Sequence, residues 1–217
     1  MTTREDILGR VRRQLGRTEE NAASGRAALQ SYIAARSAGP RGTLAGDLLQ
    51  RFCEKSAAMS CSVDHVTRLD QAPAAIACYL TDHDLPRQAL CWPELAALPW
   101  SDAGLEVVAR PTRGSDLVGI TGCYCALAET GSLLLCSGAA TPAALSLLPE
   151  THIAIVSAAR IVAGMEEAWQ LLRSELGELP RALNFISGPS RTGDIEQTIV
   201  LGAHGPYRVH IVIVAEH

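Results

Sequence analysis

From residue 44 to its end, the chain alternates short apolar runs with segments of helical periodicity. The runs are rich in Val, Ile, Leu and Ala, which is typical of strands buried on both faces of a parallel sheet. Between them, apolar residues recur at helical spacing, for example in 44–58 and 71–80. The alternation predicts an α/β fold with a mostly parallel central sheet flanked by helices. The predicted strands are 62–66, 89–92, 105–109, 117–120, 133–136, 152–156, 182–186 and 209–215.

The first forty residues have a different pattern. Residues 3–17 place apolar side chains on one helical face, acids in the first turn, and arginines on the other face, which we interpret as solvated. Residues 19–31 are weakly patterned, and 37–42 is typical of a loop. We therefore predict an N-terminal helical arm over residues 1–40, lying on the main body or on a neighbouring subunit. A single α/β domain over residues 41–217 follows it.

Composition excludes several classes of protein. The chain has 217 residues, of which 47% are apolar and 19% charged, and its formal net charge is −4. A general nucleic-acid binder would show a basic excess, so that class is disfavoured. No apolar run approaches the roughly 18 to 20 residues needed to span a bilayer, and the N-terminus lacks the apolar region of a secretory signal.

Cysteine and histidine spacing argues against a metal site. The seven cysteines follow no Cys-x-x-Cys pattern or other cluster spacing, and the histidines lack paired ligand spacing. We interpret the cysteines as reduced thiols that act mainly as small core side chains. Cys123 and Cys125 would share a face in an extended segment, and we leave their role open. This pattern predicts a cytoplasmic protein with no metal of its own.

The segment 187–194, Ser-Gly-Pro-Ser-Arg-Thr-Gly-Asp, is the first of three loops rich in glycine and small polar residues. It follows a predicted strand, and we expect a short helix after it. Backbone amides at a helix start suit an anion, and Arg191 can bind a carboxylate through two hydrogen bonds. Alternatively, Ser190 or Thr192 only caps the helix, and Asp194 complements its dipole. Both interpretations stay open.

The second loop, 202–206, has the sequence Gly-Ala-His-Gly-Pro and comes directly before the last predicted strand. Gly202 is a natural C-cap for the expected short helix, and Pro206 a natural stop. His204 stands between two small residues, where its ring could reach a shared cleft and act as acid, base or donor. A structural hydrogen bond is the alternative role.

The third loop contains Glu129, Thr130 and Gly131, and it follows the segment that includes Thr121. Partial burial would raise the pKa of Glu129 and suit it to general acid–base chemistry or nucleophilic attack. The alternative is that Glu129 only caps backbone amides in a turn. We expect the three loops to gather at the carboxyl ends of the strands, where open α/β sheets bind ligands.

Together these segments resemble the signature of the LUD domain family. The matching strings are Gly119-Ile120-Thr121, Ala128-Glu129-Thr130-Gly131, Leu148-Pro149 with His152, Ser187-Gly188-Pro189-Ser190-Arg191-Thr192 with Asp194-Ile195-Glu196, and Gly202 with His204-Gly205-Pro206. The resemblance implies a fold like that of sugar-phosphate isomerases and CoA transferases. It also implies a role in oxidising L-lactate to pyruvate alongside iron–sulfur partner proteins. Larger relatives carry a cysteine-rich ferredoxin-like extension, so its absence here predicts no cofactor bound by this chain.

The leading hypothesis is an accessory subunit of a lactate-oxidation system whose loops bind a small carboxylate or a partner loop. Glu129 and His204 would handle protons as the catalytic candidates. The candidate substrate-binding residues are Thr121, Thr130, Gly131, Ser190, Arg191, Thr192 and Asp194. One alternative is a stand-alone enzyme of the CoA-transferase or phosphosugar-isomerase type that uses Glu129. Another is a non-catalytic scaffold whose arginine-rich arm docks a partner, and a homo-oligomer also stays open.

Overall fold

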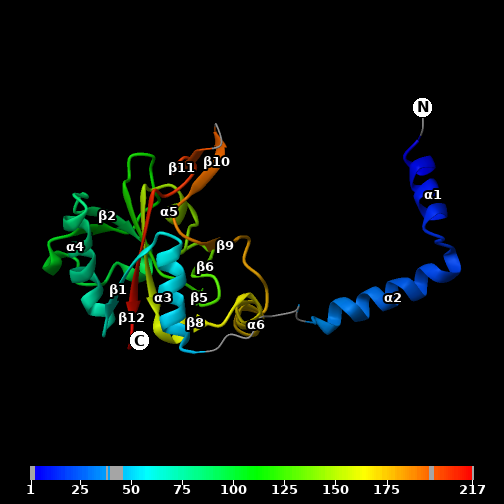
Figure 1. The fold of residues 1–217 in the computed structure, drawn as a ribbon, viewed down its shortest axis with the longest axis horizontal. Helices are drawn as coiled ribbons and strands as arrows, with labels where there is room; N and C mark the ends of the chain where they lie inside the picture. Colours follow the sequence, from blue (N-terminus) through cyan, green and yellow to red (C-terminus); the bar gives the residue numbers. More distant parts are fainter. Residues whose placement is uncertain (1–2, 38, 40–45, 196–197, 217) are drawn as a thin grey trace. The chain divides into compact units, whose positions relative to one another are not determined.

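The computed structural model describes residues 3–37, 39, 46–195 and 198–216, and Figure 1 shows its fold. The chain divides into two compact units, Met1–Thr43 and Leu44–His217. The first unit contains two helices, α1 (Arg4–Gln14) and α2 (Glu19–Ala35). The helix predicted within 3–17 is confirmed, whereas the weakly patterned 19–31 is also helical. The loop predicted at 37–42 lies almost wholly outside the described residues.

Helix-capping signals explain why both segments of the first unit are helical. The Thr3 hydroxyl accepts from the Asp6 amide while the Asp6 carboxylate accepts from the Thr3 amide, which is a capping box. Thr18 and Asn21 form the same arrangement at the start of α2. These local bonds satisfy amides that a helix start otherwise leaves without partners. They therefore specify the second helix where apolar periodicity is weak.

A six-stranded sheet forms the centre of the second unit, and all its neighbouring strands are parallel. This confirms the predicted α/β class. In spatial order, the strands are β1 (Ser62–Val66), β12 (Arg208–Val214), β7 (Thr151–Ser157), β4 (Val118–Thr121), β2 (Gln88–Cys91) and β3 (Glu106–Val108).

A second, mixed sheet packs beside the parallel one. Its order is β8 (Ile161–Val162), β5 (Cys125–Leu127), β6 (Ser132–Cys136) and β9 (Leu183–Ile186). β6 runs antiparallel to both of its neighbours, while β5 and β8 are parallel. The strands predicted at 133–136 and 182–186 are confirmed in this sheet. β5 and β8 were not predicted, because strands of three and two residues carry too little periodicity to be recognised.

Helices cover both sheets of this unit. The α-helices are α3 (Leu48–Ala58), α4 (Ala72–Asp82), α5 (Ala144–Leu147) and α6 (Met165–Leu176). Single 3₁₀ turns are η1 (Leu69–Gln71), η2 (Pro93–Leu95), η3 (Ser101–Ala103) and η4 (Ala158–Arg160). The apolar periodicity from Ile161 onward favours one continuous helix. In the structure, Ile161 and Val162 form β8, and helix α6 begins only at Met165.

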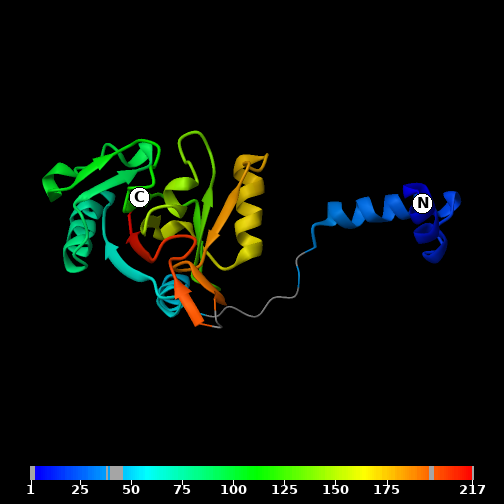
Figure 2. The same ribbon diagram turned by 90° about the horizontal axis from the view of Figure 1, so that it is seen from above.

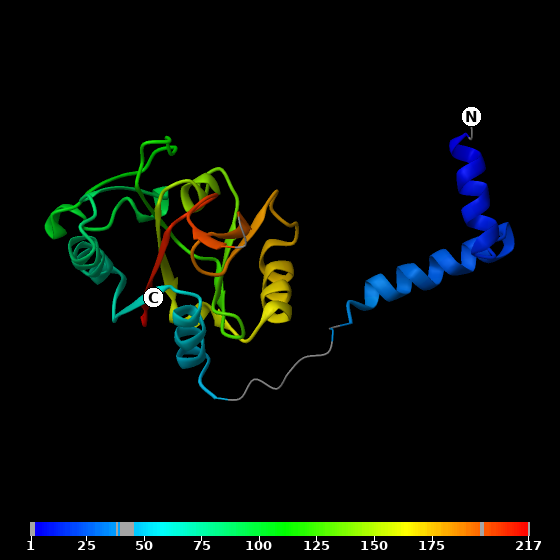
Figure 3. The ribbon, with the colours of Figure 1, turned by 45° about the horizontal axis from the view of Figure 1, so that its top comes forward.

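Apolar side chains on the two faces of the parallel sheet enter different clusters. On one face, Ile153 and Val212 belong to the cluster that includes Ile76 of α4. On the other face, Ile211 belongs to the cluster that includes Phe52 of α3 and side chains of β6. Helix α6 covers the outer side of the second sheet, and Figures 2 and 3 show α4 and α6 at opposite sides of this unit. Burial on both faces explains the continuous apolar runs.

The helix predicted between the 187–194 loop and Gly202 is wrong. A β-hairpin occupies this segment, formed by β10 (Arg191–Ile195) and β11 (Thr198–Leu201). Gly202, whose φ is 75°, therefore follows a strand and does not end a helix. The Thr-Ile-Val-Leu sequence of β11 is rich in β-branched residues, which favour strands. The hairpin therefore removes the helix start that the anion interpretation of this loop required.

No helix in the described part of the chain is long and apolar enough to cross a membrane.

Candidate functional site

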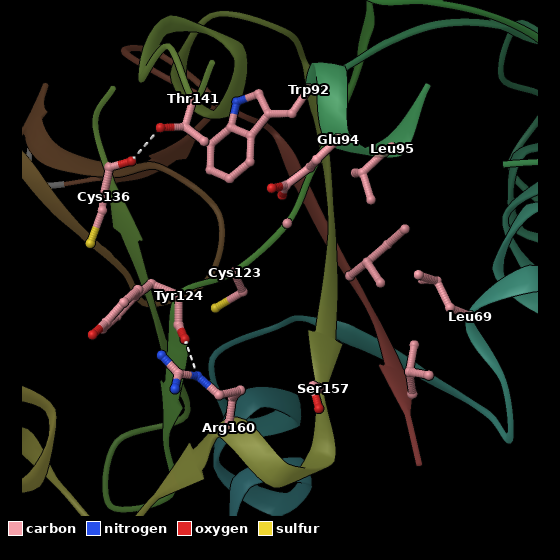
Figure 4. Close-up of a pocket in the computed structure, with 13 residues that line it drawn as sticks. Leu69, Trp92, Glu94, Leu95, Cys123, Tyr124, Cys136, Thr141, Ser157 and Arg160 are labelled. Carbon is pink, nitrogen blue, oxygen red and sulfur yellow. Dashed lines mark hydrogen bonds between the residues drawn. The ribbon is translucent and has the colours of Figure 1, made fainter. Parts of the chain in front are cut away.

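A cavity of about 590 Å³ opens at the carboxyl ends of the parallel strands. Its walls come from residues at or just after the ends of β2, β4, β7 and β12, together with side chains near β5 and β6 (Figure 4). The lining residues are Leu69, Trp92, Glu94, Leu95, Gly122, Cys123, Tyr124, Cys136, Thr141, Ile155, Ser157, Arg160 and Val214. We call this cavity the carboxyl-edge pocket. Its position and size are those at which open α/β sheets bind ligands.

Glu94 places an exposed carboxylate at this pocket, in the 3₁₀ turn after β2. Gly122 makes room for it, because a Cβ at this position would collide with Glu94 Oε1 and approach the Trp92 ring to 3.6 Å. Figure 4 shows the carboxylate beside the indole, whose Nε1 donates to the Pro142 carbonyl at 3.4 Å. The glycine thus allows an acid and an aromatic ring to share one wall.

Arg160 brings a positive charge to the opposite side of the pocket, but Glu175 neutralises it. Its Nη1 and Nη2 donate to the two Glu175 oxygens at 2.7 and 2.8 Å, and its Nε donates to the Tyr124 carbonyl at 2.9 Å. These bonds hold the pKa of Glu175 down at about 2. The Tyr124 hydroxyl also donates to Glu175, at 2.7 Å, and burial together with this carboxylate raises its pKa to about 12. Arg160 is therefore already paired with an anion.

Two small polar side chains in the pocket wall are uncharged, one of them half-buried and the other buried. Cys123 Sγ donates to the Cys125 carbonyl at 3.0 Å, and burial raises the pKa of this thiol, which keeps it protonated. The Ser157 hydroxyl is buried without a hydrogen-bond partner among the described residues. Neither group supplies charge to a ligand. Within the described part of the chain, no group of His, Cys, Asp and Glu side chains is arranged to hold a metal ion.

The three loops singled out in the sequence meet elsewhere, and we call their meeting place the loop junction (129–132, 187–191 and 202–206). Ser132 Oγ lies 2.7 Å from Thr130 Oγ1 and 2.5 Å from Ser187 Oγ, which joins the third loop to the first. The Ser190 amide donates to the Pro206 carbonyl at 2.9 Å, and the Gly202 amide donates to the Ser190 carbonyl at 2.8 Å. These bonds join the first loop to the second.

The loop junction and the pocket lie at opposite ends of the parallel strands. Residues 202–206 directly precede β12, so they lie at its amino end. Gly131 packs against Lys55 and Ser56, and Gly188 packs against Met59, all in the last turns of α3 before β1. The expectation that these loops gather at the carboxyl ends of the strands is therefore wrong. None of the nine predicted site residues lines the carboxyl-edge pocket.

Arg191 is held at the C-terminal end of α3. Its Nη2 donates to the Met59 carbonyl at 3.1 Å and to Ser60 Oγ at 2.7 Å. A guanidinium is favourable there, because the last carbonyls of a helix carry partial negative charge. Thr192 and Asp194 continue from it into β10.

The two catalytic candidates of the sequence are exposed. The Glu129 amide donates to the Ala163 carbonyl at 2.9 Å, and its carboxylate lies against Gly164, so the partial burial expected for this acid is absent. His204 lies at the surface of the second loop. Among the described residues, no hydrogen bond or ion pair joins Glu129, Arg191 and His204. The structure thus brings their loops together without linking these three side chains.

Thr121 is buried in β4, where its hydroxyl lies 2.8 Å from His152 Nε2. Burial lowers the pKa of His152 to about 4, so the ring is neutral. This Thr–His pair is internal to the sheet.

The sequence interpretation missed the residues that line the pocket. Glu94 follows the predicted strand 89–92, and Arg160 follows the predicted strand 152–156. The same carboxyl-end rule, applied to each parallel strand in turn, would have pointed to these two positions. Attention to glycine-rich loops favoured the loop junction instead.

The parallel sheet with its flanking helices and carboxyl-edge pocket defines an α/β protein with a ligand-sized cavity. Residues 110–214 match the family model of the LUD domain, so the chain carries a LUD domain, as its motifs predicted.

Among its relatives, the chain is 34% identical over 131 residues to lactate utilization protein C of Bacillus subtilis (strain 168), covering 58% of this chain and 54% of the relative. It is 40% identical over 118 residues to lactate utilization protein C 1 of Bacillus mycoides (strain KBAB4), covering 53% and 50%. The matched segments thus span about half the length of the curated relatives.

A crystal structure of a DUF162 family protein from Deinococcus radiodurans superimposes with a TM-score of 0.61 at 27% identity, covering 77% of this chain and 96% of the other. This match confirms the fold class. The expected likeness to sugar-phosphate isomerases and CoA transferases stays a prediction.

Proposed function

We propose that this chain takes part in the oxidation of L-lactate to pyruvate as a cytoplasmic subunit that acts with iron–sulfur partner proteins. The observation that carries the proposal is its similarity to lactate utilization protein C in several bacteria. The electrons of this oxidation need an acceptor, and the partners' clusters would supply it. This chain would contribute binding of the small carboxylate or of a partner loop.

The loop junction is the place where we expect the carboxylate. Both hydrogen bonds that fix Arg191 come from Nη2, so its guanidinium keeps further N–H donors on an exposed residue. Small hydroxyl residues lie in the adjoining loops. The same loops contain His204 and Glu129, and both of these residues are exposed. The carboxyl-edge pocket suits a carboxylate less, because Glu175 already pairs with Arg160.

Reconstitution with the partners tests this function. The full chain is combined with iron–sulfur proteins of a lactate-oxidation system, and reduction of an electron acceptor by L-lactate is measured with and without the chain. We expect Arg191→Ala and His204→Ala each to lower the lactate-dependent rate about tenfold, since each removes one interaction with the substrate. Arg181→Ala, at another exposed arginine, is the control and should leave the rate unchanged.

The possible results separate the function from its site. A rate that is the same with and without the chain would refute the role in lactate oxidation. A rate that depends on the chain but is unaffected by both substitutions would refute the loop junction as the carboxylate site. The stand-alone enzyme alternative gains no support from the structure, because Glu129 is exposed and lacks the desolvating pocket expected for a nucleophile or base.

A further inference from the structure

The carboxyl-edge pocket has no free positive charge to offer. Two charged side chains line it, Glu94 and Arg160, and the arginine is paired with Glu175 through two short hydrogen bonds. The lining therefore carries one uncompensated negative charge. A carboxylate or phosphate bound here would meet Glu94 without an unpaired cation to offset it. The pocket thus favours an uncharged ligand that supplies hydrogen-bond donors.

Glu94 is placed to accept such donors. An ionised carboxylate accepts through two oxygens and donates nothing, so two neighbouring hydroxyl groups match it well. It lies just beyond the carboxyl end of β2 in the parallel sheet. An acid at such a position receives ribose hydroxyls in dinucleotide-binding folds. Gly122 leaves the space that this carboxylate occupies.

One part of the remaining wall is apolar. Leu69, Leu95, Ile155 and Val214 belong to or pack on one core cluster and line the same pocket, and the indole of Trp92 lies next to Glu94 (Figure 4). Such a surface suits a planar ring system. At about 590 Å³ the cavity is much larger than lactate requires and falls in the range of drug-sized ligands.

We propose that the carboxyl-edge pocket binds a nucleoside, with the ribose diol on the Glu94 carboxylate and the base against the apolar wall. This inference goes beyond the proposed role in lactate oxidation and does not depend on it. The same chemistry could come from a free nucleoside or from the nucleoside part of a larger cofactor. The charge of the pocket predicts that phosphate groups would add nothing to binding there.

Calorimetric titration of the full chain tests the proposal with adenosine, guanosine, cytidine and uridine as probes. We expect at least one to bind, and its 2′,3′-dideoxy analogue to bind about tenfold or more weakly, because the hydrogen bonds to Glu94 are lost. The matching 5′-monophosphate should bind no more tightly than the nucleoside. Free ribose and the free base should each bind more weakly than the nucleoside they compose.

A pair of variants tests whether the nucleoside binds to Glu94. Glu94→Gln keeps the size of the side chain and removes its charge, and we expect it to weaken nucleoside binding about tenfold. Glu150→Gln, at an exposed glutamate next to the start of β7, is the control and should bind like the unchanged chain. Thermal unfolding of both variants confirms that they fold.

Three results would overturn the proposal. They are absence of binding by all four nucleosides at millimolar concentration, equal affinity for the dideoxy analogue, and unchanged affinity in folded Glu94→Gln. A monophosphate that binds tenfold more tightly than its nucleoside would instead show a cation site for phosphate, contrary to the charge argument. None of these results bears on lactate oxidation, which is measured with the partner proteins.

Discussion

The two ends of the parallel sheet differ in what their polar groups do. At the amino end, the hydroxyls and amides of the loop junction bond to one another, and one nitrogen of Arg191 bonds to the end of α3. At the carboxyl end, the pocket keeps a cavity and an exposed carboxylate that no cation in its lining neutralises. The difference teaches that a recognisable glycine-rich motif can encode packing, while a cavity is assembled from single residues after separate strands.

Glycines show the same difference. Gly131 and Gly188 have positive φ angles of 69° and 81°, and a Cβ on either would collide with backbone atoms of α3 or the turn after it. Gly122 has an ordinary φ, and a Cβ there would meet the end of the Glu94 side chain. Glycine at the loop junction is therefore required by the fold, whereas at the pocket it is required by the position of one carboxylate.

The largest effect is expected from Gly188→Ala, which should lower the free energy of unfolding by about 2–4 kcal/mol. The new methyl group would collide with the Met59 carbonyl, and the backbone would stay in a left-handed conformation that alanine disfavours. Gly193→Ala is the matched control, because a Cβ there has nothing within 4 Å and no positive φ. Urea denaturation of both variants measures the difference, and equal stability would contradict a structural role for this loop.

Some elements of the fold could be predicted from the sequence pattern and others could not, for physical reasons. The eight predicted strands are all present. The central strands β4, β7 and β12 were easy to recognise, because burial on both faces leaves continuous apolar runs. β5 and β8 were too short, and the hairpin at 191–201 was mistaken for a helix. The three loops were expected at the wrong end of the sheet. Residues 202–206 precede the parallel strand β12, and a loop that precedes such a strand lies at its amino end.

A smaller effect is expected from pH. His152 is fully buried with a pKa of about 4, against about 6.5 in the unfolded chain. Between these values only the unfolded chain binds the proton, so stability falls as the pH drops from about 7 toward 4. The loss at pH 5 is on the order of 2 kcal/mol. Unfolding in urea between pH 7.5 and 5 measures this slope.

Removing both members of the buried pair should flatten the slope. Thr121→Val combined with His152→Leu leaves neither partner without a hydrogen bond, so the folded state should persist. Part of the slope will remain, because burial also lowers the pKa of His210. Glu175 near the pocket is ionised in both states in this window, since its folded pKa is about 2 and its stabilising effect is lost only as the pH falls below about 4.5. If the double variant keeps the same dependence of the unfolding free energy on pH, burial does not lower the pKa of His152 as described.

The smallest effect on stability, and the sharpest test of the comparison, is expected from Gly122→Ala. The methyl group would displace only the end of the exposed Glu94 side chain, so the free energy of unfolding should change by less than about 1 kcal/mol. Nucleoside affinity should nevertheless fall about tenfold, because the carboxylate can no longer lie beside Trp92. Calorimetry and urea denaturation of the same preparation measure both quantities. A loss of stability as large as that of Gly188→Ala would mean that this glycine is a packing element too, and the two ends of the sheet would then differ less than their polar groups indicate.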